Sequence, residues 1–226
     1  MHDSPPLGPE VDRHPAKRPE RVTLAGRYVD VVPLDPITHG DALFEATAGP
    51  DEDALWAYLS DGPFRDRASF DRSIERKARS EDPFFFAIVD RASSRAAGLA
   101  ALMRIDPAHR VIEVGSIIYS RALQRTRGAT EAMYLMARYV FDDLRYRRYE
   151  WKCNASNAAS REAALRLGFT FEGVFRQHMI VKGRNRDTAW FAIVDGDWPA
   201  VREAFEAWLH PSNFDAGGLQ RRPLRG

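Results

Sequence analysis

The stretch "VIEVGSIIYSRALQRTRGATEAMYLMARYVFDDLRYRRYEWKC" (Val111–Cys153) holds two short strand-like runs on either side of a helical pattern. The first run is rich in β-branched residues, and the middle part carries apolar residues at helical spacing. A strand, a crossover helix and a second strand in this order make the two strands parallel neighbours with a right-handed connection. The stretch therefore predicts a parallel pair of strands within the sheet.

The rest of the chain adds helices and antiparallel strands to this unit. "RYVDVVPL" (residues 27–34) predicts a first strand, and helical patterns follow up to residue 80. The runs "PFFFAIVDR", "RAAGLAALMRI" and "RVIEVGSIIYS" predict an antiparallel meander. A helix in "SNAASREAALRLG", two strands joined at "KGRN" and a last helix complete the order. We therefore expect an α+β (mixed α/β) fold with a mostly antiparallel sheet of about seven strands.

The two ends of the chain differ in composition from the middle. Residues 1–26 are rich in proline and charge, which predicts an extended arm that is either loose or wrapped on the body. Residues 27–210 are expected to form a single domain, with "DPITHGDALFEATAG" starting a helix at Asp35 or Thr38. Residues 211–226 predict a flexible tail.

Composition narrows the class of protein. The chain has 33 basic and 32 acidic residues and a net charge of +1, which argues against a general nucleic-acid binder on electrostatic grounds. Its single cysteine, Cys153, allows no intrachain disulfide and fits a reducing cytoplasm. There is no apolar run of roughly 18 residues and no signal-peptide pattern, so we expect a cytoplasmic protein without a membrane span.

The loop before the predicted crossover helix has the features of an anion site. The amino end of a helix offers free N–H groups and the positive end of its dipole, and residues 124–127 ("QRTR") add a hydroxyl and two guanidinium groups. Gly128 and Ala129 are expected to leave the backbone open to a large anion such as a pyrophosphate. The alternative interpretation is a solvated, charged first turn of an ordinary helix.

A second group of polar residues follows the next parallel strand. Asn154, Asn157 and Ser160 are placed at the end of that strand and in the first turn of its helix. Because neighbouring parallel strands end at the same edge of a sheet, both groups are predicted to face one ligand site.

Four segments in this order resemble the GCN5-related N-acetyltransferases (GNAT). They are "IEVGSIIYS", "LQRTRGATEA", "ASNAASREAALRLGFTFEG" and "KGRNRDTAWFAI". More narrowly, the chain is similar to the subgroup of ribosomal-protein N-terminal acetyltransferases. The resemblance covers most of residues 27–198 and implies the GNAT acyl-CoA fold, with a parallel central pair of strands that splay apart. It also implies acetyl-CoA as the co-substrate, an amine as the acceptor and no metal.

The resemblance carries over to particular residues. The family's pyrophosphate loop, Gln/Arg-x-x-Gly-x-Gly/Ala, matches Gln124 and Ala129, while Arg127 replaces its internal glycine. The strand after residue 111 would pair with the pantetheine arm and offer N–H groups to the thioester oxygen. The cofactor-binding residues implied in this way are Ile117, Tyr119, Gln124, Arg125, Thr126, Arg127, Gly128, Ala129, Asn157 and Ser160.

Two residues are candidates for catalysis. Many family members have a tyrosine where this chain has Ala164, and Ser160, one helical turn earlier, is implied to protonate the leaving thiolate instead. Glu113 is a candidate base for the amine, the alternative being a strand carboxylate that is solvated or paired with arginine. Cys153 is expected to be a small buried residue rather than an acyl carrier. The six histidines lack metal-ligand spacing, and His178 either lines the acceptor side or is simply exposed.

These observations predict an acetyl-CoA-dependent N-acetyltransferase that transfers the acetyl group directly to a primary amine. The amine would belong to a protein N-terminus or to a small or aminoacyl compound. The alternative is a non-catalytic acyl-CoA-binding module with the same fold. The sequence leaves a homodimer open, with the "KGRNRD" hairpin as a candidate contact.

Overall fold

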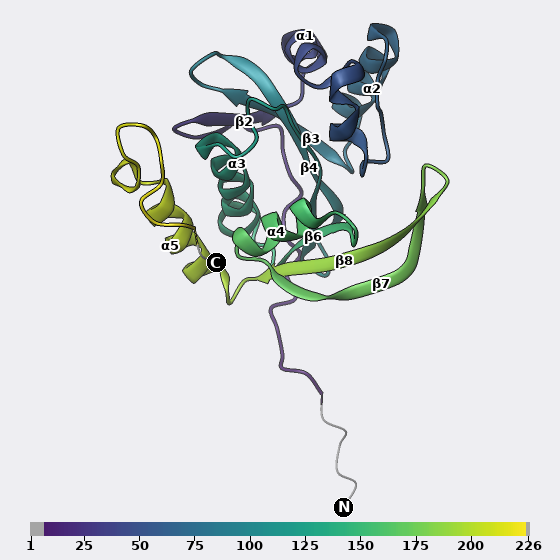
Figure 1. The fold of residues 1–226 in the computed structure, drawn as a ribbon. Helices are drawn as coiled ribbons and strands as arrows, with labels where there is room; N and C mark the ends of the chain where they lie inside the picture. Colours follow the sequence, from purple (N-terminus) through teal and green to yellow (C-terminus); the bar gives the residue numbers. More distant parts are fainter. Residues whose placement is uncertain (1–6, 225–226) are drawn as a thin grey trace, which may run out of the picture.

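The computed structural model describes residues 7–224, which form one eight-stranded sheet flanked by helices (Figure 1). The strands are β1 (Leu24–Ala25), β2 (Val29–Pro33), β3 (Phe84–Asp90), β4 (Arg95–Asp106), β5 (Val111–Tyr119), β6 (Arg148–Asn154), β7 (Thr170–Val181) and β8 (Arg184–Val194). The α-helices are α1 (Pro36–Thr47), α2 (Arg67–Arg79), α3 (Arg127–Arg138), α4 (Ala158–Arg166) and α5 (Trp198–Leu209). Short helical turns are η1 (Pro50–Trp56), η2 (Tyr139–Asp143) and η3 (Pro211–Asn213).

The order of strands confirms the predicted fold class. It runs β1-β2-β3-β4-β5-β6-β8-β7, and β5 and β6 are the parallel pair in an otherwise antiparallel sheet. The sheet has eight strands rather than about seven, because the two-residue strand β1 was too short to leave a pattern in the sequence.

The crossover helix α3 begins earlier than expected. It starts at Arg127 rather than near Ala129, because Thr126 is its N-cap and the Thr126 hydroxyl accepts the N–H of Ala129 at 3.1 Å. The helix continues past Arg138 as the π-helical turn η2. At α1 the cap is Asp35, whose Oδ1 accepts the N–H groups of Ile37 and Thr38 at 2.7 and 2.9 Å.

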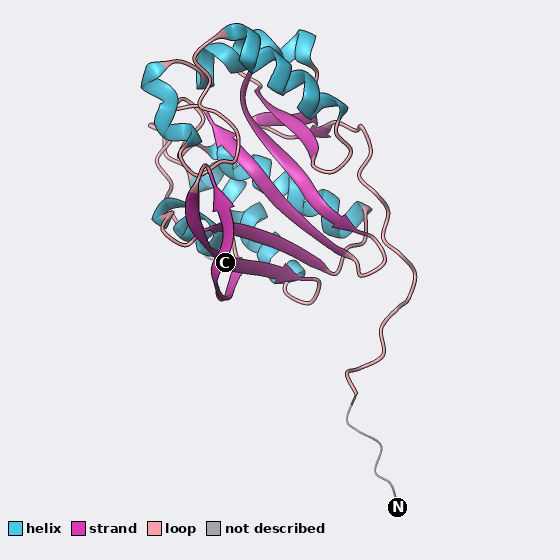
Figure 2. Cartoon of the chain, turned by 90° about the vertical axis from the view of Figure 1, so that its right-hand side faces the viewer, coloured by secondary structure: helices cyan, strands magenta, loops and turns pink. Residues whose placement is uncertain are grey.

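Two hydrophobic cores lie on opposite faces of the sheet (Figure 2). On one face, α3 and α5 pack on the β-strands through side chains such as Met136, Phe205 and Ile112. On the other face, α1 and α2 cover β3 and β4 through Leu43, Phe70 and Phe85. Beyond β4, this second face carries charged and aromatic side chains, which are described below with the site.

The described parts of both chain ends contact the body. Ala16 and Lys17 donate backbone hydrogen bonds to Pro107 and Leu144 at 2.9 and 3.1 Å, so this part of the predicted arm is wrapped. After α5, residues 211–224 fold back, and Phe214 and Leu224 are buried. The outermost residues of the predicted arm and tail, 1–6 and 225–226, lie outside the described residues.

Between residues 7 and 224, the structure contains no helix that combines the length and the apolar composition needed to cross a bilayer.

Candidate functional site

The two parallel strands separate halfway along their length. β5 and β6 pair from Val111↔Arg148 to Val114↔Trp151, and the remainder of each strand continues without pairing to the other. A register shift against β4 lies at the same place, where Ser116 has a φ of +50°. Such bulges turn a strand away from its neighbour. The N–H groups on the separating edge of β5 are therefore placed to pair with a ligand rather than with β6.

The amino end of α3 lies where β5 ends, and it has free donors. Within residues 7–224, the N–H groups of Arg125, Arg127 and Gly128 have no hydrogen-bond acceptor. The hydroxyl of Thr126 caps the helix and donates to the carbonyl of Leu123 at 2.7 Å. The predicted anion site is therefore built from backbone N–H groups and the helix dipole, while the Thr126 side chain is already occupied by the helix.

Gly128 has a packing role that the sequence did not show. A Cβ atom at this position would lie 2.7 Å from Cγ1 of Val29, so the absence of a side chain lets α3 approach β2. We expected Gly128 and Ala129 to keep the backbone open to an anion, but both residues are buried. The close approach of α3 to β2 therefore requires a glycine at position 128, whether or not an anion binds there.

The two arginines of the loop are used differently. The guanidinium of Arg127 stacks between the rings of Tyr28 and Phe214, with its Cζ 4.8 and 4.7 Å from the two ring centroids. Arg125 is exposed and has a φ of +60°. A cavity of about 600 Å³ is lined by the turns around β2 and β3, by one residue of β4 and by Leu123, Thr126, Arg127 and Gly128 at the start of α3. It therefore adjoins the amino end of α3, on the β4 side of β5.

Gln124 and Tyr119 join the end of β5 to α3. Gln124 Nε2 donates to the carbonyl of Tyr119 at 3.1 Å, and the Tyr119 hydroxyl donates to the carbonyl of Ala129 at 3.2 Å. Burial raises the pKa of Tyr119 above its usual value, so this hydroxyl stays protonated as a donor. These side chains hold the predicted coenzyme edge in place, and Ile117 packs beside them against the core.

Ser160 lies at the end of the other separating strand. It is in the first turn of α4, where the Oδ1 of Asn157 accepts its N–H at 3.2 Å. The Ser160 Oγ accepts the indole N–H of Trp151 at 3.0 Å, which leaves its own O–H free to donate. Burial raises the pKa of the neighbouring Cys153 thiol, and the Ser160 hydroxyl beside it partly offsets this effect. Ala164, the position at which the family resemblance implies a tyrosine in many members, is a fully buried residue of α4.

Glu113 lies on the face of the sheet opposite to α3, within a chain of alternating charges. Its Oε2 lies 2.7 Å from Arg104 Nη1 and 3.0 Å from Lys152 Nζ. Lys152 also contacts Glu150 at 2.7 Å, and Arg148 joins Glu150 to Glu172. Glu113 and Lys152 are almost fully buried. The sequence allowed a paired strand carboxylate as one interpretation, and the structure has this pairing.

The hairpin of β7 and β8 extends beyond the sheet and curves toward the region of η1 and α2 (Figure 1). At its turn, Lys182 Nζ donates to the carbonyl of Trp56 at 2.8 Å. Nearby, the Tyr58 hydroxyl donates to the carbonyl of Ser156 at 3.2 Å. The hairpin and η1 therefore enclose the face that carries Lys152. Sequence reasoning did not find this enclosure, because the contacts join residues more than 90 positions apart.

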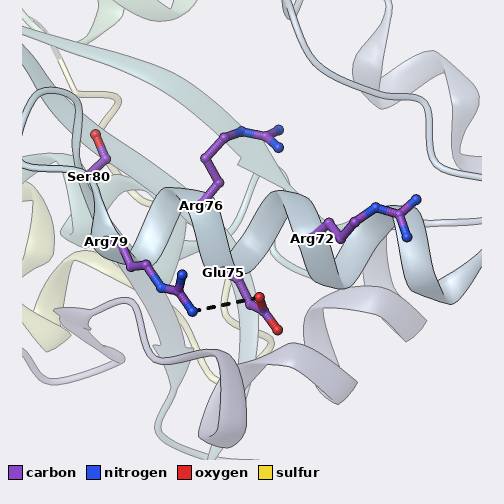
Figure 3. A pocket seen from close by; sticks show the side chains of 5 residues that line it. All are labelled: Arg72, Glu75, Arg76, Arg79 and Ser80. Atoms are coloured by element: carbon purple, nitrogen blue, oxygen red, sulfur yellow. Dashed lines mark ion pairs between the residues drawn. The ribbon is translucent and has the colours of Figure 1, made fainter.

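A separate hollow of about 440 Å³ lies on the outer face of α2 (Figure 3). Its side chains are Arg72, Glu75, Arg76, Arg79 and Ser80. Arg79 reaches Glu75 at 3.9 Å, whereas Arg72 and Arg76 extend away from it. Because α2 packs on β3, two strands from the separating pair, this hollow is no part of the predicted site.

Comparison with known proteins supports the fold and identifies the family. Residues 32–170 match the family model of the acetyltransferase (GNAT) domain. The chain belongs to the GNAT acetyltransferase family, which uses acetyl-CoA as the co-substrate. A search of curated proteins gives no match.

Solved structures share the fold over nearly the whole chain. A GCN5-related N-acetyltransferase from Brucella melitensis is 51% identical with a TM-score of 0.92, over 93% of this chain and 96% of that one. A probable GNAT-family acetyltransferase from Chromobacterium violaceum is 38% identical with a TM-score of 0.78, over 87% and 100% of the two chains. A ribosomal-protein-S5-alanine acetyltransferase from Vibrio fischeri is 15% identical, with a TM-score of 0.61 over 78% and 98%, and shares the fold alone.

Proposed function

We propose that this protein is an N-acetyltransferase that transfers the acetyl group of acetyl-CoA directly to a primary amine. The observation that carries the proposal is the separation of β5 and β6 beside the free N–H groups at the start of α3. The pyrophosphate would bind the free N–H groups of Arg125, Arg127 and Gly128. The pantetheine arm would extend along residues 117–119 of β5, so that the thioester reaches Ser160.

The reaction needs no covalent enzyme intermediate. The amine nitrogen attacks the thioester carbon, the carbon–sulfur bond breaks, and the CoA thiolate leaves. Ser160 is suited to protonate this thiolate, since Trp151 occupies a lone pair of its oxygen and leaves the O–H to donate. The N–H groups of β5 would stabilise the negative charge on the carbonyl oxygen. In this proposal Asn157 caps α4 with its Oδ1 and offers its amide N–H to the coenzyme arm.

The amine must lose a proton, and Glu113 remains our proposed acceptor for it. Its carboxylate is on the acceptor side, but Oε2 is held by Arg104 and Lys152. Only Oε1 is left to receive the proton, which an ordered water molecule would relay from the amine to the carboxylate. The likeness to the ribosomal-protein acetylase concerns the fold, so a protein N-terminus and a small amine are both retained as acceptors.

Turnover in a Ser160→Ala variant tests the proposal. We expect wild type to release free thiol from acetyl-CoA with at least one class of amine. We also expect kcat to fall by about 10²-fold in the variant, as is typical for loss of a general acid. Coenzyme affinity, measured by calorimetry, should change by less than about twofold, because the serine acts on the leaving group.

Ser69→Ala is a matched control for this experiment. Ser69 occupies the same first-turn position of α2, where Asp66 accepts its N–H at 2.8 Å, and it is remote from the site. An unchanged kcat in Ser160→Ala would show that Ser160 does not protonate the leaving thiolate. Tight coenzyme binding without thiol release for any amine would instead show a binding module.

A further inference from the structure

Three alternate residues of β8, namely Arg186, Thr188 and Trp190, lie on the face of the sheet that the hairpin encloses. Trp190 pairs in register with Lys152 of β6, and the Lys152 ammonium lies 3.8 Å from the centroid of the indole ring. Thr188 pairs with Asn154, next to Cys153 at the separating end of β6. This strip of β8 therefore leads from the hairpin to the place where the thioester is proposed to lie.

Among residues 7–224, the charges on this face leave Arg186 without an ion-pair partner. Arg104, Lys152 and Arg148 alternate with Glu113, Glu150 and Glu172, and each contact in this chain joins opposite charges. These six side chains therefore carry no net charge together. Arg186 lies beside them, yet it makes no ion pair with any residue between 7 and 224. Arg186 is thus an excess positive charge at the enclosed face.

Two buried donors on the same strip have no acceptor. Across residues 7–224, the structure offers no hydrogen-bond partner to Arg186 Nε or to Trp190 Nε1, and both atoms are buried. Leaving such donors unpaired is costly, which favours a ligand that supplies oxygen acceptors. A guanidinium binds a carboxylate through two parallel hydrogen bonds, and an indole N–H adds a further donor.

The position of Arg186 places the anion close to the reacting amine. Burial raises the pKa of the Cys153 thiol, and the positive charge of Arg186 is among the influences that oppose this effect. Arg186 is also near enough to Glu113 to interact with its charge. In the register of the sheet, Arg186 lies two residues beyond Thr188, the partner of Asn154, and so at the end of β6 that separates from β5, on the face opposite to Cys153.

A bulge in β7 brings a further side chain to the strip. Pairing with β8 shifts between Phe175 and Met179, and Gln177 adopts a φ of +51°. Asp187 stabilises the bulge by accepting the N–H of Gln177 at 2.7 Å. The bulge turns His178 toward Thr188, with 2.9 Å between Nδ1 and Oγ1. His178 and the hairpin thus form the outer wall of the enclosed face.

We propose that the amine acceptor carries a carboxylate close to its amino group and that Arg186, together with the indole N–H of Trp190, binds this carboxylate. The proposal rests on the proposed acetyl transfer and names the chemical class of its acceptor. The carboxylate would complete the pairing of the excess cation and satisfy both unpaired donors. A free amino acid supplies such a group in its α-carboxylate, and a peptide supplies it when its first residue is aspartate or glutamate.

Kinetics with matched amines test the proposal. Glycine is compared with glycinamide, and a peptide that begins with aspartate is compared with the same peptide beginning with asparagine. We expect wild type to prefer the carboxylate member of at least one pair by tenfold or more in kcat/KM. Arg186→Gln should abolish this preference by raising KM for the carboxylate member, whereas Arg186→Lys should retain part of the preference.

Arg184→Gln is the matched control, because Arg184 is an exposed arginine two residues before Arg186 on the same strand, next to the turn of the hairpin. It should behave like wild type. Equal kcat/KM within both pairs for wild type, or a preference that persists in Arg186→Gln, would overturn the proposal. The pair that responds also distinguishes a free amino acid from a peptide.

A binding experiment separates this inference from the proposed function. N-acetylglycine and N-acetylglycinamide, or the N-acetylated peptides, are titrated into the protein saturated with CoA, which requires no turnover. Tighter binding of the carboxylate form that is lost in Arg186→Gln supports the proposal even if no thiol is released. Turnover without any such difference would support the proposed acetyltransferase function and contradict the proposal that the acceptor carries a carboxylate.

Discussion

The two sides of the separating strands are built in different ways. The coenzyme side, at the start of α3, is made largely of backbone: free N–H groups, a helix dipole and a glycine that lets α3 approach β2. The acceptor side, on β6 and β8, is made of side chains, with a buried chain of charges and unpaired donors. A backbone site suits a ligand shared by a whole family, whereas side chains can differ from one acceptor to another.

The largest effect is expected on the acceptor side. Lys152→Met leaves Glu113 and Glu150 buried without their shared cation, which should lower the free energy of unfolding by about 3–5 kcal/mol. Urea denaturation monitored by tryptophan fluorescence measures this loss. Lys17→Met, at an exposed lysine, is the control and should change stability little. A loss below about 1 kcal/mol in Lys152→Met would show that this face does not depend on its charges.

On the coenzyme side, Gly128→Ala separates packing from ligand access. The new methyl group would meet Val29, so we expect a loss of about 1–3 kcal/mol in urea denaturation. The folded fraction should still bind acetyl-CoA with wild-type affinity. Gly196→Ala, where a Cβ would meet nothing within 4 Å, is the matched control. A variant of normal stability that has lost coenzyme affinity would show instead that Gly128 takes part in binding the coenzyme.

A smaller effect is expected from Thr126→Ala, which removes the N-cap of α3. The loss should be about 1 kcal/mol, and Thr126→Ser should restore most of it. Because the hydroxyl is occupied by the helix, coenzyme affinity should fall by less than about threefold, which corresponds to well under 1 kcal/mol. A large loss of affinity with unchanged stability would place the hydroxyl on the anion instead.

The smallest effect is expected from Cys153→Ala, at the meeting point of the two sides. Burial raises the pKa of this thiol, so it stays protonated at neutral pH and is a poor nucleophile. Direct transfer therefore predicts a kcat within about twofold of wild type. Loss of turnover together with a burst of acyl-enzyme would establish the covalent route.

The strand and helix of the proposed coenzyme side could be predicted from the sequence because these parts are local. Strand, loop, cap and helix follow one another within residues 111–144, and each leaves a periodicity or a capping residue. Even there, the sequence did not show that Gly128 is required by Val29, almost 100 positions away. Nor did it show that Arg127 stacks between Tyr28 and Phe214.

The acceptor side was largely missed, because it depends on distant pairing. The strip from Arg186 to Trp190 becomes a surface only when β8 inserts between β6 and β7. The bulge that turns His178 has no glycine at Gln177 to signal it. Glu113 was noticed as an isolated carboxylate, and its partners Arg104 and Lys152 come from two other strands. Side-chain sites of this kind require the register of the sheet.

An NMR titration followed through backbone amides and indole N–H groups tests the central claim most directly. Adding acetyl-CoA should shift the amides of Arg125, Arg127 and Gly128 and those of residues 117–119, and should leave the indole of Trp190 nearly unchanged. Adding the N-acetylated carboxylate product together with CoA should then shift the Trp190 indole. If the amides at the start of α3 do not respond while acetyl-CoA binds, the proposed coenzyme site is wrong.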